Sequence, residues 1–193
     1  MSPGASSGTT SPTDASLFPL GPPSSPSPTT LAPVTTVEAA SPGDIPDNQV
    51  FVRYRTSGGG WSIKVPEGWA RVKSTNAVMF TDHVNFIAVT VVSAPNAPTI
   101  MSVARRDQAE LAKQKGYRAG KVSVVQRQAG PAVLITYIVD NFINPATGKV
   151  VSVANERYEF WRNGALVTVT LSTPVGSDNV DSWRTVTDSF GWE

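Results

Sequence analysis

Apolar and polar residues alternate with the period of a β-strand along much of the chain after residue 50. Residues 50–55 and 61–65 both alternate in this way, and Ser57-Gly58-Gly59-Gly60 separates them. Two further strands are predicted at residues 77–81 and 86–93. Because the second of these is almost continuously apolar, we expect it to run through the middle of a sheet with both faces covered.

A helix is predicted after Pro98-Thr99 and before Gly116, where apolar residues recur at helical spacing. Lys113 and Lys115 would then stand in its last turn, where the helix dipole favours positive charge. Asp107 falls inside the apolar stripe, so it either reaches solvent at the edge of the helix or marks a polar spot beneath it. The stripe consists of Ile100, Val103, Ala104 and Leu111.

The second half of the chain predicts an antiparallel meander. Its four strands are expected at residues 121–128, 131–140, 150–161 and 165–172. Asn163-Gly164, between the last two, is typical of a type I′ hairpin because both residues tolerate positive φ. Residues 144–148 predict a looser turn between the middle pair.

A second helix closes the chain. Ser177-Asp178-Asn179 supplies side chains suited to a helix N-cap, and Gly191 ends the helical pattern. One face of the helix carries Val180, Trp183, Val186 and Phe190. Hairpins followed by helices predict an α+β fold, with an antiparallel β-sheet flanked by helices.

Composition separates an N-terminal tail from this domain. Residues 1–46 contain ten prolines and no Lys or Arg, whereas every tryptophan and tyrosine lies beyond them. Such a segment cannot bury enough apolar surface to offset the entropy of ordering, so we predict a disordered Pro/Ser/Thr-rich tether. It is either a spacer, with a mean reach of about 40 Å, or an ordinary flexible terminus. Residues 47–193 are then the folded domain, long enough for a stable core.

The charge pattern gives no sign of a nucleic-acid or membrane-spanning protein. Residues 47–193 hold 16 basic and 12 acidic residues, a net charge of +4, and the basic residues are dispersed along the chain. No run of 18 apolar residues exists, and Met1 is followed by neither a basic nor an apolar signal region. We therefore expect no nucleic-acid partner, and we expect a monomer.

Side chains that carry chemistry are scarce. The chain has one histidine, His83, and no cysteine, so we predict no catalytic residue, no metal site and no cofactor. Glu156 and Glu159 lie three apart in a predicted strand and therefore point to opposite faces. Arg157 shares a face with Glu159, and we expect the two to form a solvated ion pair. Glu156 and Asp107 are weak candidates for a carboxylate-based hydrolase.

The aromatic residues of the meander are the better candidates for a binding site. Most aromatic residues are expected in the core, and a minority could line a concave apolar site for a lipid or another protein. The candidate ligand-binding residues are Tyr137, Phe142, Tyr158 and Trp161. Gly58-Gly59-Gly60 could also let a backbone approach a ligand, although a flexible hairpin connection is the simpler interpretation.

Two stretches of sequence carry a resemblance to a known fold. Residues 61–69 (Trp-Ser-Ile-Lys-Val-Pro-Glu-Gly-Trp) run from an aromatic-led strand into a proline–glycine turn, and residues 156–164 (Glu-Arg-Tyr-Glu-Phe-Trp-Arg-Asn-Gly) precede a strand and a closing helix. In these features the chain resembles the PsbP-like superfamily over residues 48–193. Within it the chain is similar to the LpqN/LpqT-type lipoproteins of mycobacteria and related actinobacteria, which carry a Pro/Ser/Thr-rich tether before the domain.

The resemblance implies a PsbP-like α/β sandwich, export and a lipid anchor in the cell envelope. It also implies an accessory or lipid-binding role without known catalysis. The sequence shows neither an acylated cysteine nor a signal peptide, so the anchor and the contact with a membrane are expectations from the resemblance. Three functions follow as hypotheses: a domain that binds a lipid or an envelope protein, a carboxylate-based hydrolase, and a structural or adhesive docking domain.

Overall fold

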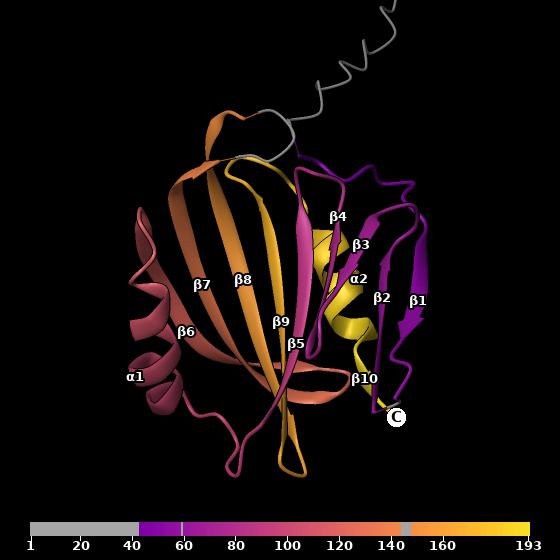
Figure 1. The fold of residues 1–193 in the computed structure, drawn as a ribbon, viewed down its shortest axis with the longest axis vertical. Coiled ribbons are helices and arrows are strands. Elements are labelled where there is room, and N and C mark those ends of the chain that lie inside the picture. Colours follow the sequence, from indigo (N-terminus) through magenta and orange to yellow (C-terminus); the bar gives the residue numbers. More distant parts are fainter. Residues whose placement is uncertain (1–42, 59, 144–147) are drawn as a thin grey trace, which may run out of the picture. The chain divides into compact units, whose positions relative to one another are not determined.

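The structure, a computed structural model, describes residues 43–58, 60–143 and 148–193. These residues form a seven-stranded antiparallel sheet, a three-stranded antiparallel sheet and two helices (Figure 1). The large sheet has the order β3-β4-β5-β9-β8-β7-β6. Its strands are β3 (Ala70–Lys73), β4 (Ala77–Thr81), β5 (Phe86–Ser93), β6 (Tyr117–Arg127), β7 (Gly130–Ile143), β8 (Val150–Arg162) and β9 (Ala165–Pro174).

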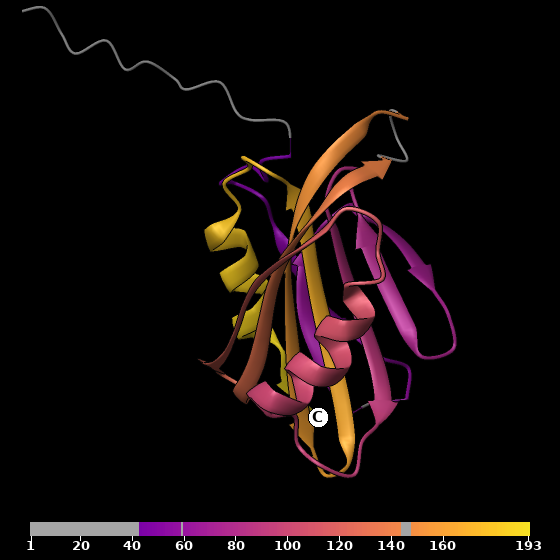
Figure 2. The same cartoon turned by 90° about the vertical axis from the view of Figure 1, so that its left-hand side faces the viewer.

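Helix α1 (Ile100–Leu111) covers one face of the large sheet, and the small sheet together with helix α2 (Val180–Ser189) covers the other face. The small sheet has the order β1-β2-β10, with β1 (Phe51–Arg55), β2 (Trp61–Pro66) and β10 (Gly191–Trp192). The two helices thus lie on opposite faces of the large sheet (Figure 2). Alpha-plus-beta architecture with an antiparallel sheet flanked by helices is therefore confirmed.

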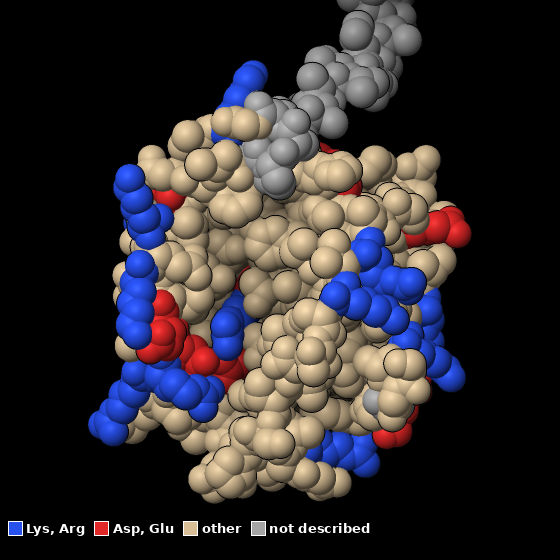
Figure 3. All heavy atoms as spheres, in the orientation of Figure 1, with Lys and Arg blue, Asp and Glu red and all other residues tan. Residues whose placement is uncertain are grey.

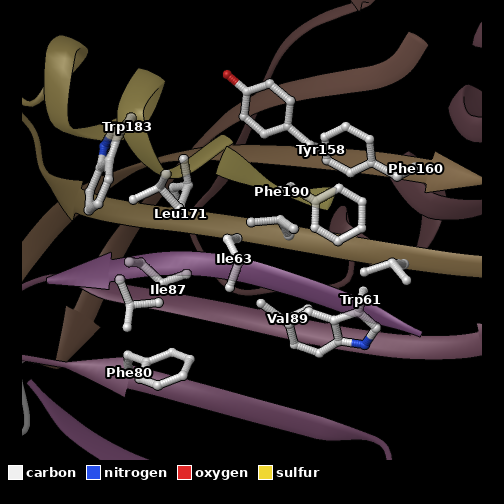
Figure 4. Close-up of a cluster of buried hydrophobic side chains, with 14 of the residues drawn as sticks. Trp61, Ile63, Phe80, Ile87, Val89, Tyr158, Phe160, Leu171, Trp183 and Phe190 are labelled. Atoms are coloured by element: carbon white, nitrogen blue, oxygen red, sulfur yellow. The ribbon is translucent and has the colours of Figure 1, made fainter. Parts of the chain in front are cut away.

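The larger of two apolar cores fills the space between the large sheet and the layer made by the small sheet and α2 (Figure 4). Phe160 of β8 stacks on Phe190 at 4.4 Å between ring centroids, and Trp61 lies 6.3 Å from the same phenylalanine. The smaller core lies under α1, where Val103 and Leu111 pack against strands β7 and β8. The large sheet is thus covered unequally on its two faces.

The predicted meander is confirmed. Strands β6, β7, β8 and β9 pair in sequence as antiparallel neighbours. Asn163 and Gly164 both adopt positive φ, 48° and 80°, as a type I′ hairpin requires. The looser turn predicted at residues 144–148 falls mostly outside the described residues.

Three predictions about individual elements are wrong. β5 lies inside the sheet, but one of its faces is only half-buried because α1 covers the sheet further along. The first helix ends at Leu111, so Lys113 and Lys115 stand after its last turn. Gly116 does not end the helix but precedes β6, where its carbonyl accepts from the Asp140 N–H of β7. Glycine is needed there because a Cβ would collide with the carbonyl of Asp140.

Two strands have no clear signature in the sequence. All four residues of β3 are exposed, so no buried face produces an alternating pattern. β10 is two residues long and pairs with β2, at Ser62 and Trp61, across most of the domain's sequence. Neither strand is detectable from local periodicity.

Asn179 does not cap α2 with its side chain. Its amide holds the beginning of the domain instead: Oδ1 accepts from the Ile45 N–H at 2.7 Å, and Nδ2 donates to the Gly43 carbonyl at 2.9 Å and to Thr173 Oγ1 at 2.8 Å. Ile45 is 6% exposed and belongs to the larger core. The folded domain therefore includes residues assigned above to the tether, and the rest of the predicted tether, residues 1–42, lies outside the described residues.

Within the described residues, neither helix has the length and apolarity needed to cross a bilayer.

Candidate functional site

The end pocket is a cavity of about 580 Å³ where the two sheets part at one end of the sandwich. Four segments that are distant in sequence border it: the β1–β2 connection, the β3–β4 turn, the β8–β9 hairpin and β10 with Glu193. Its volume lies within the roughly 300–1,000 Å³ typical of small-molecule sites. The pocket continues the larger core outwards, because Trp61 and Val89 belong to both (Figure 4).

The lining residues of the end pocket that are buried are apolar. Alternation along the strands explains this lining, since β4, β5 and β9 turn one face towards the small sheet and bury it. Tyr54 closes one side and lies edge-on to Phe80, at 5.1 Å between ring centroids. The apolar lining includes Trp61, Val78, Val89, Val91, Val167 and Trp192.

The mouth of the end pocket is polar and contains the basic residues Lys73 and Arg162. Both side chains are exposed. Glu193 also reaches the mouth, where its Oε1 lies 3.3 Å from Nε of Arg55. An apolar interior with a charged mouth suits a ligand that has one apolar and one polar end.

Gly58 and Gly60 of the β1–β2 connection line one side of the end pocket. A Cβ at Gly58 or Gly60 would meet no other atom within 4 Å, and Gly60 has a φ of +93°, which side chains rarely adopt. From the sequence alone, this glycine run could let a backbone approach a ligand, although a plain hairpin connection is the simpler interpretation. The run was the one local signal of the pocket, since the rest of its lining is assembled from segments far apart in sequence.

The four aromatic residues predicted to bind a ligand do not line the end pocket. Tyr137 is buried under α1, with its ring 5.7 Å from that of Tyr117, and Phe142 packs half-buried against the same core. Trp161 donates its indole N–H to the carbonyl of Ala94 at 2.8 Å. Burial raises the pKa of Tyr137.

Tyr158 of β8 belongs to the larger core, on the face of the large sheet that points away from α1. Its hydroxyl donates to Glu156 at 2.6 Å and accepts from Arg127 at 3.1 Å. Burial, together with the hydrogen bond to Glu156, raises the pKa of Tyr158 to about 12. The structure therefore does not bring the four residues together, and their role in binding stays a prediction.

A charge cluster of two arginines and two carboxylates lies where α1 meets β8. Arg106 Nη2 is 2.6 Å from Asp107 Oδ2 and 3.3 Å from Glu159 Oε2. Arg157 Nη2 is 3.1 Å from Asp107 Oδ1, and its Nε is 3.4 Å from Glu159 Oε1. Acidic and basic side chains are visible side by side next to α1 (Figure 3).

Burial within the charge cluster corrects one expectation and decides between two alternatives left open for Asp107. Glu159 is 0% exposed, so its pair with Arg157 is not solvated. Asp107 is 8% exposed and marks a polar spot under the helix. The pKa of Glu159 is raised to about 7. Loss of hydration is the largest cause and repulsion from Asp107 is the second, while both arginines oppose the rise.

The charge cluster is poorly placed for carboxylate chemistry. A catalytic carboxyl must reach the substrate, whereas Glu159 has no exposed surface and Asp107 is held by both arginines. Glu156 is bound by the hydroxyl of Tyr158. Within the described residues, no group of three or more His, Asp or Glu side chains is placed to hold a metal ion.

Comparisons with known proteins identify the fold. No protein-family model and no curated protein matches the sequence. Among solved structures, a Bacteroides thetaiotaomicron protein aligns with a TM-score of 0.52 at 10% identity over 73% of this chain, and the match spans 48% of that protein, about half its length. Cyanobacterial PsbP (CyanoP) of Synechocystis aligns with a TM-score of 0.50 at 17% identity, over 78% of this chain and 98% of that protein.

LpqN of Mycobacterium tuberculosis, described as involved in cell envelope biogenesis, aligns with a TM-score of 0.46 at 12% identity, over 76% of this chain and 92% of LpqN. That likeness is too distant to support an inference about function. At these identities the shared structure establishes the fold, which is PsbP-like.

Proposed function

We propose that this domain is a non-catalytic binding module of the cell envelope that holds the apolar chain of a lipid-like ligand in the end pocket. The observation that carries the proposal is the pocket itself: about 580 Å³, lined inside by valines and tryptophans, with a polar mouth. Transferring an apolar chain from water into such a lining is favourable by about 25 cal/mol per Å² of buried apolar surface.

The scarcity of histidine and cysteine, together with the pairing of the buried carboxylates, supports a role in binding. The chain has one histidine and no cysteine, and the buried carboxylates of the charge cluster are paired with arginines. His83 lies in an exposed turn, where its backbone N–H donates to Thr81 Oγ1 at 2.9 Å. Location in the envelope and a lipid anchor belong to the proposal and rest on the resemblance of the sequence to envelope lipoproteins.

Native mass spectrometry of protein produced in an actinobacterial host tests the proposal. We expect a lipid to co-purify with the wild-type protein and to be lost from Ala165→Phe, because Ala165 is half-buried in the pocket wall and a phenyl ring there would occupy ligand space. Ala119→Phe is the matched control, since Ala119 is exposed on β6, outside the pocket.

Calorimetric titration with 1-decanol provides a second measurement with a defined ligand. Wild-type protein and Ala119→Phe should bind it, and Ala165→Phe should bind it at least tenfold more weakly. If no lipid co-purifies and decanol does not bind, the pocket has no role in holding apolar chains and the proposal is wrong.

A further inference from the structure

Two basic side chains reach the mouth of the end pocket from different hairpins. Lys73 ends β3, next to the β3–β4 turn, and Arg162 ends β8, at the β8–β9 hairpin. The two hairpins lie at the same end of the large sheet, one on each side of β5. The pairing of strands thus gathers two positive charges that lie about ninety residues apart in the sequence.

An aromatic ring holds the first of these charges at the pocket. Nζ of Lys73 lies 5.6 Å from the centroid of the Tyr54 ring, and Cζ of Arg71 lies 5.8 Å from the same centroid. Tyr54 itself lines the pocket. Cations within about 6 Å of an aromatic face are attracted to it, so Tyr54 keeps positive charge beside the opening. Basic side chains gather over β3 (Figure 3).

The positive charge at the mouth is not neutralised by neighbouring carboxylates. Across the described part of the chain, neither Lys73 nor Arg162 forms an ion pair with an acidic side chain. The acidic residue at the mouth, Glu193, is paired with Arg55. The charge cluster at α1 is different, because its two arginines face two carboxylates. Positive charge left unpaired beside an apolar cavity favours a ligand that brings its own negative charge.

We infer that the end pocket selects amphiphiles with an anionic head group, a carboxylate or phosphate ester, which Lys73 and Arg162 hold at the mouth while the chain occupies the apolar interior. This inference rests on the proposed function and adds the chemical class of the ligand. Arginine can bind either oxyanion through two parallel hydrogen bonds, and lysine acts as a compact positive charge.

Paired titrations separate the head group from the chain. Decyl phosphate and 1-decanol have the same chain and differ in head-group charge, and their binding is measured by calorimetry below the concentrations at which they aggregate. Wild-type protein is expected to bind decyl phosphate about tenfold more tightly than decanol, since two exposed charged contacts each contribute modestly. This preference should shrink at 0.5 M salt because exposed charges are screened.

The double variant Lys73→Gln/Arg162→Gln should lose the preference, so that its affinities for decyl phosphate and decanol become about equal. Lys115→Gln/Lys121→Gln is the matched control: it removes the same charge from two exposed positions outside the pocket and should keep the preference. Inorganic phosphate alone should not displace decyl phosphate at equal concentration. Displacement would indicate a site for free anions and would overturn the inference.

The remaining outcomes distinguish the two proposals. If wild-type protein binds decanol and decyl phosphate equally, the selection for anionic ligands is refuted while the proposed function stands. If the control variant loses the preference together with the mouth variant, net charge and not the mouth is responsible, and the assignment to Lys73 and Arg162 is overturned. If neither ligand binds and no lipid co-purifies, the proposed function itself fails.

Discussion

Replacing Glu159 with glutamine should change how the stability of the domain depends on pH. Glutamine resembles the protonated carboxyl in shape and charge and leaves every other titratable side chain in place. Burial raises the pKa of Glu159 from 4.5 to about 7. A carboxyl whose pKa is higher in the folded than in the unfolded protein binds its proton more tightly when folded. Its contribution to stability is therefore complete below pH 4.5 and is lost as the pH rises through 7.

The size of the effect follows from those two values. Raising the pKa of one carboxyl from 4.5 to about 7 changes the relative free energy of its two protonation states by about 3 kcal/mol. Between pH 5 and pH 8, Glu159 should lower the free energy of unfolding by about 2–3 kcal/mol. The glutamine variant lacks this contribution, so its stability relative to the wild type should rise by the same amount over that interval.

Urea unfolding followed by tryptophan fluorescence at pH 5, 6, 7 and 8 measures both profiles. The difference between the variant and the wild type cancels the titrating groups that do not interact with Glu159. Asp107→Asn provides a second check, because removing the adjacent negative charge should lower the pKa of Glu159 and move the loss of stability to lower pH. Parallel profiles for the wild type and Glu159→Gln would refute the reasoning, since they would mean that Glu159 is solvated or paired well enough to titrate as it does in the unfolded chain.

Three further predictions concern stability and are checked by equilibrium unfolding at pH 7. Gly43→Ala should cost about 1–3 kcal/mol, because its φ is +102° and the added Cβ would lie 2.7 Å from the Pro174 ring, whereas Gly58→Ala, which meets no atom within 4 Å, should change little. Asn179→Ala should cost about 2–4 kcal/mol, since it removes the buried amide that holds the beginning of the domain. Phe190→Ala should cost about 3–5 kcal/mol, because the ring is 1% exposed in the larger core. An effect of Gly43→Ala no larger than that of Gly58→Ala, or losses below 1 kcal/mol for the other two variants, would contradict the packing described here.

Local sequence determined those parts of the fold in which neighbouring residues settle the outcome. Alternation predicted β1 and β2 almost to the residue, and a nearly continuous apolar run predicted the bounds of β5. The backbone freedom of Asn163 and Gly164 placed the last hairpin. The α+β class followed from the order of hairpins and helices, and no long-range contact was needed to derive it.

The candidate site depended on contacts that local patterns do not encode. Lining residues of the end pocket come from four separated segments, and β10 meets β2 across most of the domain. Glu159 has the sequence context of a surface strand residue, yet α1 and Arg157 enclose it. Asn179 has the chemistry of a helix cap and serves instead to hold Ile45. Periodicity reports which face of an element is apolar, whereas the partner of that face is chosen by the packing of the whole chain, and only the tertiary structure shows that choice.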